Sequence, residues 1–262
     1  MLSFIESYNQ MKIIISLLLS LSSVAAHAQT KQTVPVLMYH QIVDTKPPGN
    51  EVVREARFRE HMQFLKDNGY TTILVSELAD FMYGNLELPI KSVAITFDDG
   101  WKSSLAAAKI LEEFDFAATF YVMSGTFSDP QYFSENDVIR LSKNRNFEIG
   151  AHSHTHFMEW VSDLSKMDTR IMIGELFMSK TILEKIIKKP VKSFAWPFGY
   201  TRPGVIESAS RLGFTSTVLV NAISNNSSGM TPLEIRRISV SGLCNATQLG
   251  EMLDSGRLNL CK

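Results

Sequence analysis

Short apolar runs alternate with amphipathic segments along most of the chain. Eight runs rich in β-branched and aromatic residues have the length and composition of strands: 34–40, 71–75, 92–97, 117–122, 147–151, 192–196, 214–220 and 235–240. Apolar residues at helical spacing fall between most of these runs, at 57–68, 76–83, 103–114, 134–142, 168–189, 203–212 and 247–253. This alternation is typical of a parallel sheet covered by helices. Eight repeats favour a closed or nearly closed (β/α) barrel over an open doubly wound sheet.

The first 28 residues have a different pattern, that of a secretory signal peptide. Lys12 precedes 14 apolar or small residues (13–26), and the tripeptide AHA (26–28) is a small-x-small cleavage signal. The apolar stretch is shorter than the roughly 20 residues that a bilayer span needs. We therefore expect residues 1–28 to be removed, with an uncleaved N-terminal anchor as the alternative.

The remaining residues, 29–262, have the composition of a single exported domain without a stable membrane span. The whole chain of 262 residues is 45% hydrophobic and 20% charged, which excludes a disordered, collagen-like or multi-span membrane protein. Its net charge of −1 gives no reason to expect a nucleic-acid partner. We expect the domain in the periplasm or outside the cell, and Met11 is an alternative start of translation.

Two cysteines, Cys244 and Cys261, lie near the C-terminus. In an oxidising compartment they could form a disulfide that ties down the tail, and two free thiols are the alternative. Their spacing is not that of a metal site, so we assign them no chemistry.

Two adjacent carboxylates, Asp98 and Asp99, follow the apolar run 92–97 directly. Carboxylates in such a place are costly unless they bind something. Gly100 lets the chain turn, so both side chains can reach one site. A simple Asp-Gly turn is the alternative explanation.

Three histidines stand close together in the sequence HSHTH (152–156), after the run 147–151. His152 and His156 are four residues apart, a spacing that can chelate one Zn²⁺ ion. With one of the two aspartates they make a two-histidine, one-carboxylate set that leaves a coordination position open for water. The other aspartate would then be free to act as a base.

His40 ends the run 34–40. Taken alone, a structural role is the simpler explanation for it. The carboxyl ends of parallel strands share one rim of a barrel, however, and active sites lie on that rim. The aspartate pair and His152 also follow predicted strands, so we expect all of them to meet there.

Four segments resemble the motifs of the polysaccharide deacetylase family (carbohydrate esterase family 4, the NodB-homology domain): VLMYHQI (36–42), TFDDG (96–100), HSHTH (152–156) and FAWPFG (194–199). The resemblance is closest to the branch of poly-N-acetylglucosamine deacetylases. It extends from about residue 34 to about residue 240. It implies an α/β fold, a distorted (β/α) barrel of about seven or eight strands, and places the catalytic domain in residues 29–262.

The resemblance also implies roles for single residues. Asp98 matches the catalytic base, and His40 matches the general acid of this branch. The ligands of a divalent metal would be Asp99, His152 and His156, with Zn²⁺ expected ahead of Ni²⁺ or Co²⁺.

The motif FAWPFG implies the substrate-binding residues. Pro197 and Phe198 match the wall of the substrate groove, and the backbone N–H of Phe198 matches the donor to the oxyanion. Trp196 is a candidate for substrate binding. With Trp101 and Trp160 it is also a candidate for stacking on sugar rings, and core packing is the alternative for each tryptophan.

The chain departs from the family pattern in several places. Many members carry an arginine that orients the base where this chain has Ala195, and tyrosine is usual where Phe198 stands. The late Leu-x-Leu-His motif has no clear match. If Ile238 and Val240 face the helices, Arg237 points into the barrel, and we predict that it supplies the missing arginine by pairing with Asp98. A solvated pair of basic residues is the alternative.

The predicted function is therefore metal-dependent removal of N-acetyl groups from an amino-sugar glycan, such as poly-N-acetylglucosamine, peptidoglycan or a chitin-like chain, with release of acetate. Alternatives are a deacetylase of a lipid-linked amino sugar or of acetyl-xylan, a cyclic-amide hydrolase, and a catalytically silent glycan-binding protein.

Overall fold

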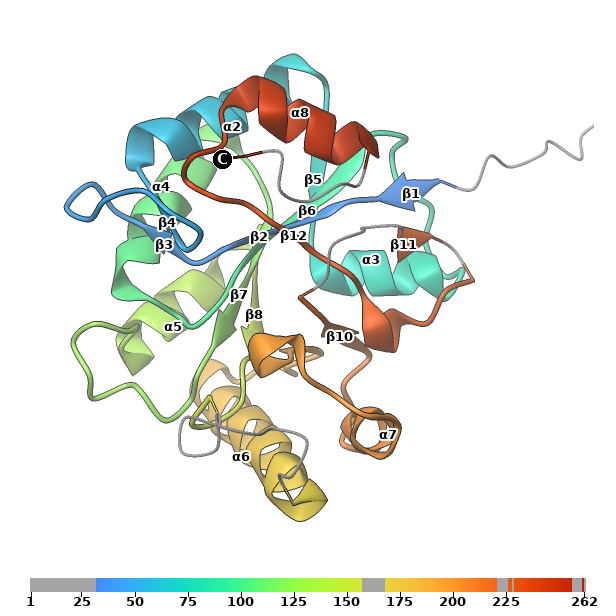
Figure 1. Ribbon diagram of the computed structural model, residues 1–262. Coiled ribbons are helices and arrows are strands. Elements are labelled where there is room, and N and C mark those ends of the chain that lie inside the picture. Colours follow the sequence, from blue (N-terminus) through green and yellow to red (C-terminus); the bar gives the residue numbers. More distant parts are fainter. Residues whose placement is uncertain (1–31, 157–167, 221–225, 228, 256–260, 262) are drawn as a thin grey trace, which may run out of the picture. The chain divides into compact units, whose positions relative to one another are not determined.

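The computed structural model describes residues 32–156, 168–220, 226–227, 229–255 and 261 (Figure 1). The predicted signal peptide, residues 1–28, lies outside the described residues, and so does Trp160.

A curled parallel sheet forms the centre of the domain (Figure 1). Seven strands follow one another in the order β10-β9-β8-β7-β6-β2-β12, and β5 also pairs with β6. Their bounds are β2 (Val36–Tyr39), β5 (Thr71–Ile73), β6 (Ser92–Phe97), β7 (Ala118–Val122), β8 (Phe147–Ala151), β9 (Ser193–Ala195), β10 (Ser216–Val218) and β12 (Ile238–Ser239). Each of the eight predicted runs contributes one of these strands, so the predicted distorted barrel is confirmed.

The two ends of the sheet approach each other at Ile235, just before β12. Its N–H donates to the carbonyl of Thr217 over 3.0 Å, and its carbonyl accepts from the N–H of Leu219 over 2.8 Å. The residues that lead into β12 therefore bond to β10, while β12 itself pairs with β2. This short contact brings the last part of the sheet across the mouth of an otherwise open barrel.

Helices cover the outside of the sheet (Figure 1). The outer layer comprises α2 (Glu55–Asp67), α4 (Leu105–Phe114), α5 (Glu135–Lys143), α6 (Thr169–Ile187) and α7 (Pro203–Arg211), and α8 (Ala246–Ser255) packs on α2. Helix α3 (Val75–Met82) contacts β10 and the short elements β11 (Asn226–Ser227) and η5 (Pro232–Glu234). The remaining short elements are β1 (Thr33–Val34), β3 (Gln41–Ile42), β4 (Val52–Val53), η1 (Lys102–Ser104) and η4 (Pro197–Gly199).

Local sequence signals set the ends of several helices. The N-cap of α5 is Ser134, whose hydroxyl accepts from the N–H of Asp137, while the Asp137 carboxylate accepts from the N–H of Ser134 in return. Helix α6 ends where Lys188 adopts a left-handed conformation with φ 57°, two residues before Pro190. Both ends therefore have a local cause, a capping box at the start of α5 and a proline shortly after α6.

The alternation of side chains along each strand divides the core in two. Val93, Ile95 and Phe97 of β6 pack in the cluster beneath the helices, whereas Ala94 belongs to the cluster inside the barrel. Because side chains on a strand alternate between its faces, Thr96 and Asp98 also point into the barrel. The same alternation on β8 turns His152 inward.

Cys244 and Cys261 form a disulfide, which settles the alternatives left open for the two cysteines. The carbonyl of Cys244 accepts a hydrogen bond of 2.9 Å from Nε2 of the buried His61. Nδ1 of His61 in turn lies 3.1 Å from the hydroxyl of Tyr39, which ends β2. The disulfide therefore anchors a segment that is bonded into the core. Over the described ranges, we find no helix long and apolar enough to cross a membrane.

This disulfide yields a first prediction. Cys261→Ser should lower the free energy of unfolding by about 3 kcal/mol, because the bond closes a loop with a sequence separation of 17 residues. Urea unfolding with and without a reductant measures the effect. The reductant should lower the stability of the wild type to that of the variant, and an unchanged midpoint in Cys261→Ser would contradict the prediction.

Candidate active site

The side chains predicted to carry the chemistry follow the carboxyl ends of neighbouring strands. His40 follows β2, Asp98 and Asp99 follow β6, and His152 follows β8. These strands are parallel and lie in one stretch of the sheet, in the order β8-β7-β6-β2, so their ends lie on one rim. The sequence HSHTH continues from β8, which brings His156 to the same rim.

Asp98 forms a buried ion pair with Arg237, which comes from the residues before β12. Arg237 donates to both carboxylate oxygens, from Nη1 and from Nη2, over 2.6 Å each. Nη1 also donates to the hydroxyl of Thr96 over 3.2 Å, and Nε donates to the carbonyl of Leu219 over 3.1 Å. Arg237 is 0% exposed and Asp98 is 2% exposed. The predicted contact between the two residues is therefore present, and it excludes a solvated pair of basic residues.

The side chain of Asp99 points away from that of Asp98 and contacts both candidate histidine ligands. Its Oδ1 lies 3.1 Å from Nε2 of His152 and 3.4 Å from Nε2 of His156. The two Nε2 atoms lie 3.1 Å from each other. Among the described residues, these three are the group of His, Cys, Asp and Glu side chains whose ligand atoms lie close enough together, within 4.8 Å, to hold a metal ion.

Each of two ligand atoms is oriented by a second hydrogen bond. Nδ1 of His152 donates to the carbonyl of Ala195 over 2.8 Å, which directs Nε2 at the cluster. Nε1 of Trp101 donates to Oδ2 of Asp99 over 2.8 Å, which leaves Oδ1 directed at the same point. Two imidazoles and one carboxylate, oriented in this way, fit a divalent metal with positions left for water and substrate.

The electrostatics of the site keep both carboxylates ionised. Burial raises the pKa of Asp98, but the Arg237 guanidinium outweighs it and the net shift is downward. Burial likewise raises the pKa of Asp99, and its hydrogen bond with His152 outweighs it, so its pKa also falls well below the usual range. Burial lowers the pKa of His156 to about 4, which keeps this imidazole neutral and able to bind a metal at neutral pH.

Strained backbone is concentrated at this rim. Six residues other than glycine have a positive φ in the described part of the chain, and four of them belong to the site: Asp99 (70°), Ser153 (60°), His156 (61°) and Phe198 (58°). Such conformations cost about 1–3 kcal/mol each and persist where the surroundings hold them in place. At Asp99 the positive φ, followed by Gly100 at 72°, turns the second carboxylate away from Asp98.

His40 lies near the two carboxylates. Burial raises the pKa of Asp98, and the proximity of His40 acts against it in the same direction as Arg237 and His152. Its Nδ1 is buried without a hydrogen-bond partner among the described residues. The backbone carbonyl of His40 accepts from the hydroxyl of Ser104 over 2.5 Å, which fixes the chain where the imidazole leaves it.

Comparison with known proteins now decides the family. A sequence model described as polysaccharide deacetylase matches residues 85–217, about half of the chain. This chain belongs to the polysaccharide deacetylase family. Residues 85–217 contain β6 with its aspartate pair and β8 with the histidines, but not His40 or Arg237.

Single relatives agree with this membership. YxkH of Bacillus subtilis, whose name places it among the polysaccharide deacetylases, is 23% identical over 224 residues, covering 84% of this chain and 76% of YxkH. The poly-beta-1,6-N-acetyl-D-glucosamine N-deacetylase of Escherichia coli is 23% identical over 201 residues, covering 62% of this chain and 30% of the enzyme. The Streptococcus pyogenes deacetylase PplD, solved in complex with acetate, has the same fold, with a TM-score of 0.76 at 22% identity over 86% of this chain and 99% of PplD.

In this polysaccharide deacetylase, the candidate substrate-binding residues Trp196, Pro197 and Phe198 follow β9 and differ in exposure. Phe198 is 52% exposed, and its ring contacts that of His156 with centroids 4.8 Å apart, so it lies beside the candidate metal ligands. Pro197 is buried beneath it. Trp196 is 0% exposed and packs edge-on against Phe194, so its predicted role in binding substrate is wrong because its ring cannot reach a sugar.

Trp101, a candidate for stacking on sugar, makes contacts with side chains of the site. Its ring stacks on Tyr132 at a centroid distance of 4.5 Å, and the Lys46 ammonium lies 5.4 Å from its centroid. Together with the hydrogen bond to Asp99, these contacts make Trp101 a support of this candidate metal ligand. The sequence did not reveal this role, because an indole two residues after an aspartate has no distinctive pattern.

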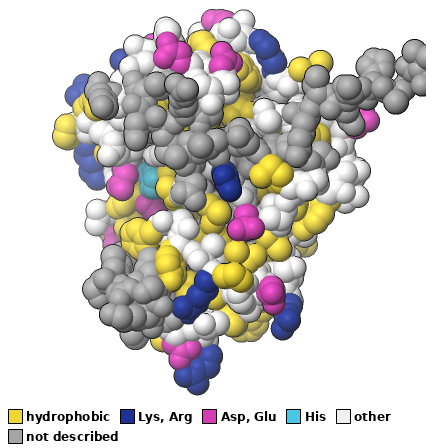
Figure 2. All heavy atoms as spheres, turned by 45° about the vertical axis from the view of Figure 1, so that its right-hand side comes forward, with side chains coloured by type: hydrophobic (Ala, Val, Ile, Leu, Met, Phe, Trp, Pro, Cys, Tyr) yellow, Lys and Arg dark blue, Asp and Glu magenta, His cyan; other side chains and the backbone are white. Residues whose placement is uncertain are grey.

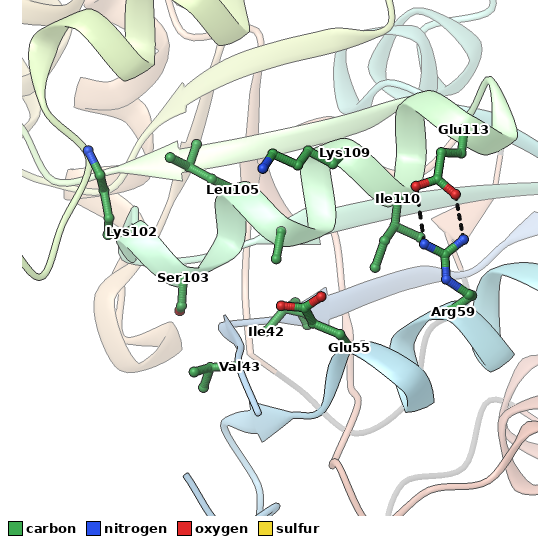
Figure 3. A pocket seen from close by; sticks show the side chains of 11 residues that line it. Ile42, Val43, Glu55, Arg59, Lys102, Ser103, Leu105, Lys109, Ile110 and Glu113 are labelled. Carbon is green, nitrogen blue, oxygen red and sulfur yellow. Dashed lines mark hydrogen bonds and ion pairs between the residues drawn. The ribbon is translucent and has the colours of Figure 1, made fainter. Parts of the chain in front are cut away.

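In the space-filling view, a histidine side chain reaches the surface between acidic side chains and a patch of hydrophobic ones (Figure 2). A cleft of about 370 Å³ lies elsewhere, on the outside of the barrel between α2 and α4 (Figure 3). Arg59 and Glu113 pair across it, and no candidate active-site residue lines it.

The ion pair yields a second prediction. Arg237→Met should lower the free energy of unfolding by about 3–5 kcal/mol at pH 7, because it leaves the buried Asp98 carboxylate without its partner. Adding Asp98→Asn to Arg237→Met should recover part of this loss, because no buried charge then lacks a partner.

The control is Arg236→Met, at the exposed neighbouring position, which should change the stability by less than about 0.5 kcal/mol. Urea unfolding of the four proteins measures the coupling. Equal effects at positions 236 and 237 would contradict the assigned ion pair.

Proposed function

We propose that this chain is a metal-dependent hydrolase that removes N-acetyl groups from an amino-sugar glycan and releases acetate. The observation that carries the proposal is that two adjacent carboxylates have different partners. Asp99 converges with His152 and His156 on one point, while Asp98 is held apart from them by Arg237. A base beside a metal site is the arrangement that hydrolysis of an unreactive amide requires.

The fit of the donor set indicates what a metal would add. When bound, a divalent ion supplies Lewis-acid activation of the acetamide carbonyl and of a water molecule, whose pKa it lowers to about 7. Zn²⁺ suits two imidazoles and a carboxylate, and Ni²⁺ or Co²⁺ would suit the same donors.

Asp98 is the residue that accepts the proton from the attacking water. Its lowered pKa keeps it ionised, and the two hydrogen bonds from Arg237 fix the orientation of its carboxylate. Arg237 thereby does the work of the family arginine that this chain lacks at Ala195. An arginine that reaches the same carboxylate from another strand can preserve the geometry although the motif is lost.

His40 is the residue that gives a proton to the departing nitrogen. Its buried Nδ1 makes no hydrogen bond within the described residues, so no structural hydrogen bond holds that atom of the imidazole. The C–N bond of the acetamide breaks, the water oxygen goes to the acyl carbon, and acetate and a free amino sugar leave. The strained turn at Phe198 presents backbone beside His156, where the N–H can support the developing oxyanion.

Two further observations support the identity of the substrate and the compartment. The Escherichia coli relative is named for poly-beta-1,6-N-acetyl-D-glucosamine, which makes that polymer the first substrate to test, ahead of peptidoglycan and chitin-like chains. The disulfide between Cys244 and Cys261 suits export to the periplasm or the exterior, as the pattern of residues 1–28 predicts.

A third prediction tests the reaction. Wild-type protein loaded with Zn²⁺ should release acetate from N-acetylglucosamine oligomers, and a chelator should abolish the release. Acetyl-xylan and a lipid-linked amino sugar serve as comparison substrates. Binding of glycan without any release of acetate would favour a silent glycan-binding protein over the enzyme.

A fourth prediction separates the roles of the residues. His152→Ala and Asp99→Asn should each lose bound metal, whereas Asp98→Asn should keep it and lose at least about 100-fold in turnover, since proton transfer by a positioned base contributes about 10²–10⁴. Elemental analysis of the dialysed proteins gives the stoichiometry, and circular dichroism verifies that they are folded. Full metal content in either ligand variant, or wild-type turnover in Asp98→Asn, would refute the assignment concerned.

A further inference from the structure

A carboxylate outside the metal-ligand set holds the loop that carries the histidines. We call residues 152–156 the histidine loop. Glu175 lies in the second turn of α6, is half-buried, and directs its side chain back at this loop. Neither the motif HSHTH nor the match to the family assigns a role to this residue.

Glu175 accepts three hydrogen bonds from two consecutive residues of the histidine loop. Its Oε2 accepts from the N–H of His154 over 2.7 Å and from the N–H of Thr155 over 2.8 Å. Its Oε1 accepts from the hydroxyl of Thr155 over 3.0 Å. Hydrogen bonds to an ionised carboxylate are about twice as strong as neutral ones, so this contact is a strong restraint on the loop backbone.

The histidine loop needs such a restraint because its backbone is strained. Ser153 and His156 have φ values of 60° and 61°. They flank the two residues whose backbone N–H groups donate to Glu175. Other hydrogen bonds of the loop backbone are made with neutral groups. The N–H of His156 donates to the hydroxyl of Ser153 over 2.7 Å, and the carbonyl of His154 accepts from the N–H of Gly125 over 2.9 Å.

The two histidines of the ligand set differ in how they are held. His152 is still bonded to the sheet, since its N–H donates to the carbonyl of Val122 over 3.0 Å and its ring donates to Ala195. His156 lies beyond the two residues that Glu175 fixes, and no hydrogen bond to the sheet is recorded for it in the described residues. The position of His156 therefore depends on the path of the loop between the two histidines.

We propose that Glu175 is a positioning residue for the metal site: it fixes the histidine loop so that His156 converges with His152 and Asp99. The inference rests on the proposed function in one respect, that these three side chains bind a divalent metal. Without Glu175, the strained loop would have to be ordered at the moment of binding, and the metal affinity would fall by that cost. Outer partners of metal ligands typically contribute about 10–100-fold in affinity.

The test is a titration of metal-free protein with Zn²⁺ by calorimetry, with the wild type, Glu175→Gln and Glu184→Gln. Glu184→Gln is the matched control, because Glu184 lies on the same helix and also accepts a loop amide, the N–H of Val191 over 2.9 Å. We expect Glu175→Gln to raise the Kd at least about tenfold, and Glu184→Gln to stay within about twofold of the wild type. A Kd for Glu175→Gln within twofold of the wild type would overturn the proposal.

A second readout keeps this inference separate from the proposed function. Hydrogen exchange of the His154 and Thr155 amides in metal-free protein reports the restraint directly, and it should be at least tenfold faster in Glu175→Gln than in the other two proteins. Unchanged exchange would overturn the positioning role even if the enzyme is active. A wild type that takes up no Zn²⁺ would instead refute the metal site, and with it the functional part of the inference.

Discussion

Two negative charges lie side by side at the end of β6, one buried on Asp98 and one partly buried on Asp99, and each needs a positive partner. Asp98 has one, the guanidinium of Arg237, at 2.6 Å from both of its oxygens. Asp99 meets two imidazoles, of which His156 has a pKa lowered to about 4 by burial. Burial lowers the pKa of His152, but the neighbouring carboxylates of Asp98 and Asp99 outweigh it and the net shift is upward, so a protonated His152 balances Asp99 when no metal is bound. A shared divalent cation would take the place of that proton and use a donor atom from each of the three side chains. The requirement for compensated charge thus gives the two carboxylates of one dipeptide different partners, which distinguishes the candidate base, Asp98, from the candidate metal ligand, Asp99.

The fold meets this requirement with pieces from distant parts of the chain. β6 and β8 supply the aspartates and His152, the residues before β12 return across the barrel with Arg237, and α6 reaches back to the histidine loop with Glu175. The same rim collects four of the six non-glycine residues with positive φ in the described part of the chain. Strain and buried charge therefore occur together at the place where the chemistry is proposed, and nearby hydrogen bonds hold both in place.

Much of this arrangement could be predicted because it follows from periodicity and strand order. Alternation along 92–97 and 235–240 turns Asp98 and Arg237 to the same side, and parallel strands bring their carboxyl ends together. The sequence could not reveal the contacts that depend on distance in space, such as the indole of Trp101 on Asp99 or the carboxylate of Glu175 on Thr155. Trp196 was misjudged because exposure cannot be read from an aromatic residue near a motif, and here the ring packs on Phe194.

The central claim is that one divalent ion completes the charge balance at Asp99. Anomalous diffraction at the zinc absorption edge, from crystals of the mature protein grown with Zn²⁺, tests it most directly. The account predicts a single strong peak about 2.0–2.2 Å from Oδ1 of Asp99 and from Nε2 of His152 and His156, with the Arg237 pair of Asp98 intact. A peak bound by Asp98 instead, or no peak among these side chains, would contradict it.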